Sequence, residues 1–306
     1  MSFDQTSRCL CANGILLHFV EYGAKDGEPV LLLHGFPEFW WAWRKQANVL
    51  AAAGFRVLML DLRGYGRSDA PPSVSSYRLP LLVEDIAAFA SELGWKQFSL
   101  VGHDWGGIIA WAVAAWHPDM IKRLVVLNAP HLDVMPKVLR KTPLQVVCSA
   151  YVGFFRLPFL PEFFLSLGDF RMLRFALIST SRRGTFGSDA IERYASEWKR
   201  PGRLSAMLNY YRALTREKRV ALGRIVPPVL ILWGRRDHAL SFPLASESLL
   251  QCVDGRILTQ RHATHWIHIE EPEWVNENIV RFLSFDHARD GAPDQTAVVE
   301  RSGHSG

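Results

Sequence analysis

Residues Gly102-His-Asp-Trp-Gly106 decide how the rest of the chain is interpreted. They follow the apolar run 98–101 and precede the helical stretch 107–116, so they predict a sharp strand-to-helix turn. The frame Gly-x-Ser-x-Gly belongs to a turn that raises a nucleophilic serine above the end of a strand. Asp104 stands where that serine is expected. The sequence therefore poses a choice between a lost nucleophile and a chemistry that needs a carboxylate.

The composition is that of a globular protein. The 306 residues are 49% hydrophobic and 21% charged, with a net charge of +5. Because Lys and Arg are spread along the chain, we expect a solvated surface and no nucleic-acid binding. The four cysteines have no metal-ligand spacing and predict free thiols in a reducing compartment.

No segment predicts stable membrane insertion. A membrane span needs about 20 clean apolar residues, and the most apolar stretch, 144–167, is broken by Arg156, Pro158 and Pro161. Asp4 and Arg8 precede any apolar run, so no secretory signal is predicted. We expect a soluble cytoplasmic protein, as a monomer or homodimer.

Short apolar runs with strand character recur along the chain, and helical stretches separate many of them. Near-continuous apolar runs are typical of parallel strands covered on both faces. Their alternation with helices predicts a mostly parallel, doubly wound α/β sheet. The predicted strands are 29–34, 55–61, 98–102, 123–128, 228–234 and 256–259, and the helices between them include 81–93 and 107–116.

The alternation fails between residues 131 and 224, in a block rich in Phe, Tyr, Leu and Arg. We predict that this block is a helical cap inserted into a sheet domain made of residues 1–130 and 225–286. The polar segment 287–306 is predicted to be a flexible tail. The helix-like stretches of the predicted cap are 162–179, 188–199 and 203–218.

Three polar residues follow predicted strands, and ligands of open α/β sheets bind beyond the carboxyl ends of strands. Asp104, Asp237 and His265 occur in the order nucleophile, acid and histidine, which is the order of the α/β-hydrolase triad. This order predicts an α/β-hydrolase fold in which Asp237 orients His265. His262 and His268 are alternatives for the base, and we interpret them as loop or helix residues.

A carboxylate nucleophile restricts the chemistry. A serine that attacked saturated carbon would leave an ether, whereas Asp104 would leave an ester that water can cleave. Asp104 therefore predicts displacement at the carbon of an epoxide or an alkyl halide, with His265 activating the water for the second step. A dead serine site kept for folding is the alternative.

The loop after the first long apolar run, 29–34, predicts an oxyanion hole. During ester hydrolysis negative charge builds on a carboxyl oxygen of Asp104, and the backbone amides of Phe36 and Trp105 are expected to receive it. His34 begins the turn that aims the first amide, and Pro37 fixes the loop, where a cis peptide bond is a further expectation.

Three motifs carry a family resemblance. His34-Gly-Phe-Pro-Glu-Phe-Trp-Trp-Ala-Trp-Arg44, Asp61-Leu-Arg-Gly-Tyr-Gly-Arg-Ser68 and Gly102-His-Asp-Trp-Gly-Gly107 resemble the soluble epoxide hydrolases of the α/β-hydrolase superfamily. The resemblance covers about residues 10–285. Haloalkane and fluoroacetate dehalogenases share these motifs, which identify the superfamily better than the substrate.

The resemblance also implies two tyrosines that donate hydrogen bonds to the epoxide oxygen. The matching residues are Tyr151 and Tyr211, and the alternative is that both belong to the core of the cap. Phe36 stands where one group of dehalogenases has a halide-binding Asn, and Trp105 stands where fluoroacetate dehalogenases have an Arg. Asn128 ends the strand from which some relatives supply the triad acid, so the acid is expected at Asp237.

The expected protein is an epoxide hydrolase that converts small apolar epoxides and water to vicinal diols, with no metal or organic cofactor. A haloalkane dehalogenase with the same triad is the alternative, and a non-catalytic receptor or scaffold is a remote one. The Phe-rich stretch that includes Phe159, Phe163 and Phe164 indicates an apolar substrate. The residues expected to contact substrate are His34, Pro37, Phe154, Phe155 and Trp266.

Overall fold

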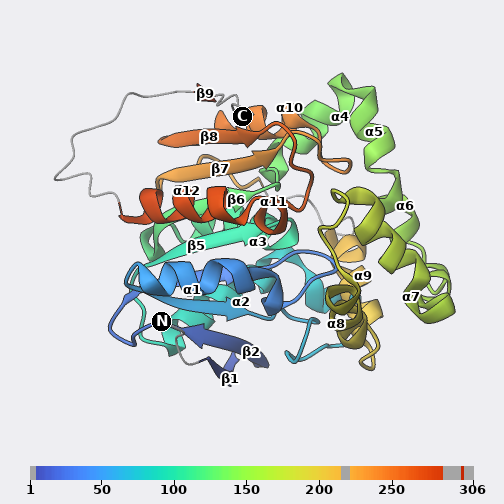
Figure 1. The fold of residues 1–306 in the computed structure, drawn as a ribbon, viewed down its shortest axis with the longest axis horizontal. Helices are drawn as coiled ribbons and strands as arrows, with labels where there is room; N and C mark the ends of the chain where they lie inside the picture. Colours follow the sequence, from blue (N-terminus) through green and yellow to red (C-terminus); the bar gives the residue numbers. More distant parts are fainter. Residues whose placement is uncertain (1–4, 215–220, 285–297, 300–306) are drawn as a thin grey trace.

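The computed structural model of the protein describes residues 5–214, 221–284 and 298–299. Its centre is a nine-stranded sheet in the order β1-β2-β4-β3-β5-β6-β7-β8-β9 (Figure 1). β2 is antiparallel to both β1 and β4, and every other neighbouring pair is parallel. The strands are β1 (Thr6–Ala12), β2 (Ile15–Tyr22), β3 (Glu28–Leu33), β4 (Phe55–Leu60), β5 (Phe98–His103), β6 (Ile121–Leu127), β7 (Val229–Gly234), β8 (Gly255–Gln260) and β9 (Val298–Val299).

The parallel strands are apolar on both faces because helices cover both faces. Successive side chains of a strand point to opposite sides, and in β3 Leu31 and Leu32 belong to two different hydrophobic clusters. Leu31 packs on the side of α2 and α3, whereas Leu32 packs on the side of α1 and α12 (Figure 1). The helices around the sheet are α1 (Arg44–Ala52), α2 (Leu79–Glu92), α3 (Trp105–Trp116), α10 (Phe242–Leu249), α11 (Ile267–Glu270) and α12 (Pro272–Ser284).

The six predicted strands and the doubly wound sheet are confirmed as β3 to β8. The hairpin of β1 and β2 is not predicted from the sequence, because polar residues interrupt its apolar pattern. His18 and Glu21 of β2 are both buried, and each has a charged partner. His18 Nδ1 lies 2.7 Å from a carboxylate oxygen of Asp61, and the Arg56 Nε donates to Glu21 at 2.7 Å.

Between β6 and β7, the described residues from 132 to 214 form helices and connecting turns. Helices α4 to α9 group at one end of the sheet in Figure 1. Among the described residues no single helix is long and apolar enough to cross a membrane, although the bent pair 145–155 and 160–180 meets that test by length and composition. The helices are α4 (Met135–Lys141), α5 (Pro143–Cys148), α6 (Ala150–Phe155), α7 (Leu160–Thr180), α8 (Ser188–Trp198) and α9 (Arg203–Leu214).

Helix α7 is broken in its middle, whereas the sequence predicted a single helix-like stretch over 162–179. Gly168, Asp169 and Phe170 all have φ between +58° and +60°, so two helical pieces meet at an angle. The last residues of the predicted helix 203–218 lie outside the described part of the chain. So does the predicted tail 287–306, except for Val298–Val299, which pair with β8.

The turn between β5 and α3 has the strained geometry that the opening motif predicts. Asp104 has φ of +49° and ψ of −120°, a conformation that side-chain-bearing residues rarely adopt. Gly106 lets this turn lie against β3, because a Cβ there would stand 2.2 Å from the Leu33 carbonyl oxygen. The position of Asp104 therefore depends on Gly106, where the packing leaves no room for a side chain.

Gly106→Ala is expected to lower the free energy of unfolding by about 2 kcal/mol or more, because the new methyl group would meet backbone that cannot move aside. Gly153 of α6 is the matched control, since a Cβ there meets nothing within 4 Å. Gly153→Ala should be neutral or stabilising by about 0.5–1 kcal/mol. Urea unfolding of both variants measures the difference, and equal losses would contradict the close packing of the turn.

Candidate active site

The Asp104 carboxylate stands at the end of β5, with each oxygen facing a different loop. The backbone amide of Phe36 donates to Oδ1 at 2.8 Å. Oδ2 lies 3.6 Å from Nε2 of His265. Among the described residues, no hydrogen bond joins the Trp105 amide to this carboxylate, so of the two amides expected in the oxyanion hole only Phe36 touches it in this state. The oxygen that faces His265 is available for chemistry.

His265 is fixed by a buried acid. Its Nδ1 donates to Asp237 Oδ2 at 2.8 Å, which leaves Nε2 facing Asp104. Asp237 is held in turn by the backbone amides of Ala239 and Leu240, which donate to Oδ1 at 2.7 and 2.9 Å. The imidazole therefore has one orientation, set from the side opposite the nucleophile.

Asn128 adds a further support that the sequence analysis did not assign. It ends the strand before β7, and its amide nitrogen donates to Asp237 Oδ2 at 2.7 Å. Its carbonyl oxygen accepts from the Gly234 amide at 2.9 Å. Asn128 thus donates to Asp237, whereas an acid at this position would repel it.

The two carboxylates control the charge of the imidazole. Burial disfavours the protonated form of His265, but Asp237 and Asp104 together raise its pKa well above the ordinary value. Burial also opposes ionisation of Asp237, yet His265, Asn128 and the Leu240 amide hold its pKa below the usual range. The resting site is thus an imidazolium between two carboxylates.

A buried network of Glu38, His103 and His268 lies beside this triad. Glu38 accepts from His103 Nδ1 at 2.9 Å and from His268 Nε2 at 3.1 Å. The other ring nitrogen of His103 lies 2.9 Å from the backbone oxygen of His265. The residue before the nucleophile is therefore connected both to the loop after β3, through Glu38, and to the loop that carries His265.

The charges of this network follow from its burial. Burial lowers the pKa of His268 to about 4, so this imidazole is neutral near pH 7. Burial opposes ionisation of Glu38, but His268 and His103 hold its pKa well below the usual value. Donor atoms of the three residues lie within 4.8 Å of one another, and zinc uses such ligands. Each of these atoms already has a hydrogen-bond partner inside the group, so we treat the group as a hydrogen-bonded network.

Tyr151 of α6 and Tyr211 of α9 face Asp104 from the helical segment. Their ring centroids are 6.0 Å apart, and Tyr211 packs 5.1 Å from the Trp105 ring. Burial raises the pKa of both hydroxyls, and the negative charge of Asp104 raises it further. Both tyrosines therefore keep their protons and can donate hydrogen bonds above the nucleophile.

Tyr210 precedes Tyr211 on α9 but points elsewhere. Its hydroxyl donates to the Arg63 carbonyl oxygen at 2.6 Å. The Phe155 ring packs beside Phe36 and Tyr211, with its centroid 5.3 Å from that of Phe36 and 5.1 Å from that of Tyr211. Phe154 lies one layer farther out, 6.0 Å from Phe155.

The remaining residues expected to contact substrate differ in depth. Trp266 is buried, and its ring centroid lies 5.1 Å from that of His265. Its indole nitrogen donates to Thr180 Oγ1 at 3.0 Å. The Phe36–Pro37 peptide bond is cis, and the Pro37 carbonyl oxygen accepts from the Trp198 indole at 2.7 Å. Both residues tie the core to the helical segment.

His34 occupies a different place from the one expected. Its ring is fully buried, Nδ1 donates to the Gly35 carbonyl oxygen at 2.9 Å, and the Leu62 amide donates to Nε2 at 3.2 Å. Because both ring nitrogens bind backbone, His34 supports the loop from below and does not offer a polar atom to substrate.

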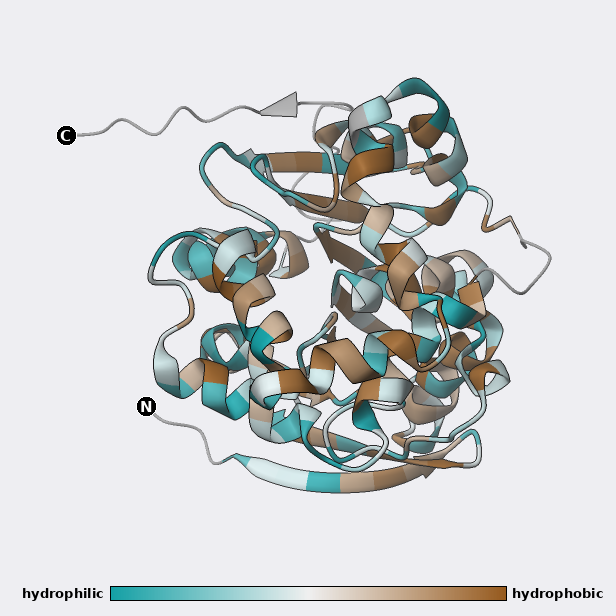
Figure 2. Cartoon of the chain, turned by 90° about the vertical axis from the view of Figure 1, so that its right-hand side faces the viewer, coloured by the Kyte–Doolittle hydropathy of each residue, from teal (hydrophilic) through white to brown (hydrophobic). Residues whose placement is uncertain are grey.

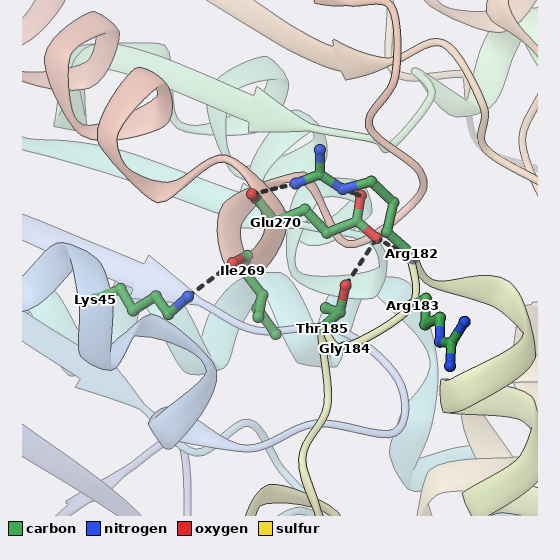
Figure 3. A pocket seen from close by; sticks show the side chains of 7 residues that line it. All are labelled: Lys45, Arg182, Arg183, Gly184, Thr185, Ile269 and Glu270. Carbon is green, nitrogen blue, oxygen red and sulfur yellow. Dashed lines mark hydrogen bonds and ion pairs between the residues drawn. The ribbon is translucent and has the colours of Figure 1, made fainter.

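A pocket near the site shows how the helical segment is attached (Figure 3). Thr185 and the backbone amide of Arg182 both donate to Glu270, at 3.4 and 2.7 Å (Figure 3). Glu270 also accepts from the amide and the hydroxyl of Thr264, each at 2.7 Å. The polar groups of this pocket are thus used to join the segment after α7 to the loop that carries His265.

Comparison with known proteins identifies the scaffold. A family model described as the alpha/beta hydrolase fold matches residues 28–272. The chain belongs to this family. Within the family, it is 39% identical over 272 residues to the AB hydrolase superfamily protein YfhM of Bacillus subtilis (strain 168), covering 89% of this chain and 95% of that protein.

Several members of the family that the chain resembles are named epoxide hydrolases. It is 36% identical over 284 residues to Epoxide hydrolase 4 of Mus musculus, covering 91% of this chain and 79% of that protein. The structure of a Bacillus megaterium epoxide hydrolase in complex with an inhibitor matches with a TM-score of 0.83 and 30% identity, over 91% of this chain and 100% of that one. Epoxide Hydrolase A from Mycobacterium thermoresistibile matches with a TM-score of 0.81 and 25% identity, over 92% and 98%. The predicted resemblance is confirmed.

The raised pKa of His265 gives a pH dependence to stability. An unfolded chain binds the same proton with a pKa near 6.5, so the folded state holds it more tightly. The resulting stabilisation is fully present below about pH 6.5 and is lost as the pH rises through the folded pKa.

We therefore expect the difference in unfolding free energy between the wild type and His265→Gln to be largest at acidic pH and to shrink at alkaline pH. Urea unfolding of both proteins between about pH 5 and 9 measures this difference. A difference that grew with pH would mean that His265 is neutral in the folded state.

Proposed function

We propose that the protein is an epoxide hydrolase that forms a covalent ester on Asp104. The observation that carries the proposal is the arrangement of one carboxylate between an imidazole on one side and two protonated tyrosines on the other. In this proposal residues 131–224 act as a cap that supplies Tyr151 and Tyr211. Residues 1–130 and 225–286 form the core that supplies Asp104, His265 and Asp237. Water is the second substrate.

The first step opens the epoxide ring. An oxygen of Asp104 attacks one ring carbon, forming a carbon–oxygen bond while the ring carbon–oxygen bond breaks and its electron pair goes to the epoxide oxygen. Tyr151 and Tyr211 donate hydrogen bonds to that oxygen and lower the cost of its charge. One of the two tyrosine hydroxyls gives its proton to the alkoxide, and the resulting tyrosinate takes up the proton of the His265 imidazolium. The product is a hydroxyalkyl ester beside a neutral imidazole.

The second step depends on the charge that the first step removes. Once Asp104 is an ester, one of the two carboxylates that raise the pKa of His265 is gone, while burial, which lowers it, remains. His265 can then act as a general base and take a proton from water. The hydroxide attacks the ester carbon, and the Phe36 amide is placed to stabilise the oxyanion. Collapse breaks the ester carbon–oxygen bond, and the leaving alkoxide takes the proton of the new carboxyl group. The diol is released, and the site again holds the Asp104 carboxylate and the His265 imidazolium.

The tyrosines favour epoxide over halide. A leaving alkoxide is a strong base that needs a proton donor, whereas a leaving halide needs only weak hydrogen-bond donors. Styrene oxide and 1-bromobutane separate the two reactions, with diol formation expected from the first and no halide release from the second. Bromide release without diol formation would assign the protein to the dehalogenases, and neither product would indicate a non-catalytic member of the family.

Two variants should separate the two steps. His265→Gln keeps the nucleophile but removes the base, so the protein should gain the mass of one epoxide molecule and turn over slowly. Asp104→Asn should gain no such mass. Intact-protein mass spectrometry after incubation with styrene oxide distinguishes them and also detects hydrolysis of the introduced amide back to the carboxylate. Diol formation by an unreverted Asp104→Asn protein would exclude the covalent route.

Tyr151→Phe and Tyr211→Phe should each slow ester formation by about 10²-fold, because each removes one hydrogen-bond donor to the developing alkoxide. Rapid-quench measurement of the alkylation step shows this effect, and hydrolysis of the preformed ester should change little. Tyr210→Phe is the matched control, since its hydroxyl bonds to the Arg63 carbonyl oxygen outside the site. Alkylation rates unaffected by both pocket variants would remove the tyrosines from the mechanism.

A further inference from the structure

Helix α7 is apolar on both of its faces. Leu165, Leu173 and Leu177 are buried toward the protein, at 3% exposure or less. A second set of apolar side chains, carried by both pieces of the broken helix, is exposed. Helices that are apolar all round normally lie inside a protein or in a membrane. We name this exposed set, together with the exposed apolar residues of the turn before α7, the outer apolar face. Its members are Leu157, Phe159, Leu160, Phe163, Phe164, Leu167, Met172, Phe175 and Ile178.

This face concentrates the exposed apolar surface of the molecule. Of the 17 large apolar side chains that are exposed among the described residues, nine belong to the outer apolar face. Phe159 and Phe175 are exposed by 84% and 68%. Figure 2 views the side of the molecule that carries the helical segment, where hydrophobic stretches recur along the helices. Contiguous exposed apolar patches of this kind mark interaction sites.

Positive charges outnumber negative ones around the outer apolar face. Residues 137–183 contain eight Lys and Arg but only two acidic residues, Glu162 and Asp169. Both acids are paired with cations, Glu162 with Arg212 and Asp169 with Arg174 and Lys199.

Two cations of this segment, unpaired within the described residues, border the outer apolar face. Arg156 and Arg171 are exposed and form no ion pair with any residue in the described part of the chain. Arg156 lies next to Leu157, and Arg171 next to Met172, so both lie at the border of the outer apolar face.

We propose that the outer apolar face docks on the surface of an anionic lipid bilayer. Exposed aromatic and aliphatic side chains bordered by Arg are the combination that binds the interface between headgroups and acyl chains. A second copy of the chain is a poorer partner, because a symmetric contact would bring these unpaired cations close to one another. The inner face of α7 is already packed on the protein, so the helix would lie along the bilayer surface.

The docking face is connected to the candidate active site by a series of aromatic rings. Phe163 lies 5.3 Å from Phe164, Phe164 lies 6.5 Å from Phe154, and Phe155 lies 5.1 Å from Tyr211. Apolar epoxides partition into bilayers, so this arrangement would present the pocket to dissolved substrate. This last link rests on the proposed function, whereas the docking itself does not.

Flotation with lipid vesicles tests the docking without any substrate. We expect the wild type to float with vesicles of phosphatidylcholine and phosphatidylglycerol and to float less with phosphatidylcholine alone. Phe163→Asp with Phe175→Asp should reduce the partition coefficient by about tenfold or more, because charges replace inserted aromatic rings. Arg156→Gln with Arg171→Gln should reduce the preference for anionic vesicles.

Val253→Asp is the matched control. Val253 is 60% exposed, close to the 59% of Phe163, but it precedes β8 at the opposite end of the parallel strands. This variant should float like the wild type. Circular dichroism checks that each variant is folded. If the Phe163→Asp, Phe175→Asp variant does not fold, the two Arg substitutions test the proposal.

Three results would overturn the proposal. They are absence of wild-type flotation with both vesicles, equal loss in the Val253→Asp control, and a concentration-dependent dimer that the Phe163→Asp, Phe175→Asp variant abolishes in light scattering. The last result would assign the face to a second copy. Failure to hydrolyse epoxides would leave the flotation result standing, so the two proposals can fail separately.

Discussion

At Asp104 the backbone leaves β5 with φ of +49° and enters α3 within one residue. This turn is possible because Gly106 lies against the Leu33 carbonyl oxygen and Gly35 lies against Asp104 itself. The same packing brings the Phe36 amide to 2.8 Å from the carboxylate. One backbone constraint therefore places both the Asp104 carboxylate and the amide that donates to it.

The electrostatics of the site is layered outward from this turn. Asp104 and Asp237 hold His265 as an imidazolium, and Asn128 and two backbone amides hold Asp237. The network around Glu38 then links neighbouring loops through buried groups. Each of these sets of contacts restricts the movement of the groups inside it. Neutralising a single carboxylate therefore changes the proton affinity of the His265 imidazole with little need for movement.

The sequence predicted the parallel strands and the nearness of Asp104, Asp237 and His265, because local patterns at the strand ends indicate both. Apolar runs mark doubly covered strands, and the flanking glycines mark the turn. It did not reveal β2, whose buried His18 and Glu21 depend on partners far along the chain. Glu38 and Asn128 were missed for the same reason, since their roles depend on contacts that only the folded chain brings together. His34, predicted to touch substrate, instead binds backbone on both sides of its ring.

Helix α7 ends where the loop of His265 is anchored. Trp266 bonds to Thr180 at the last residue of the helix, and Glu270 receives the amide of Arg182 just beyond it while also holding Thr264. A hinge motion that opened the helical segment would have to break or carry along these bonds. The attachment of the helical segment and the position of the His265 imidazole are thus coupled, because the same group of hydrogen bonds holds both.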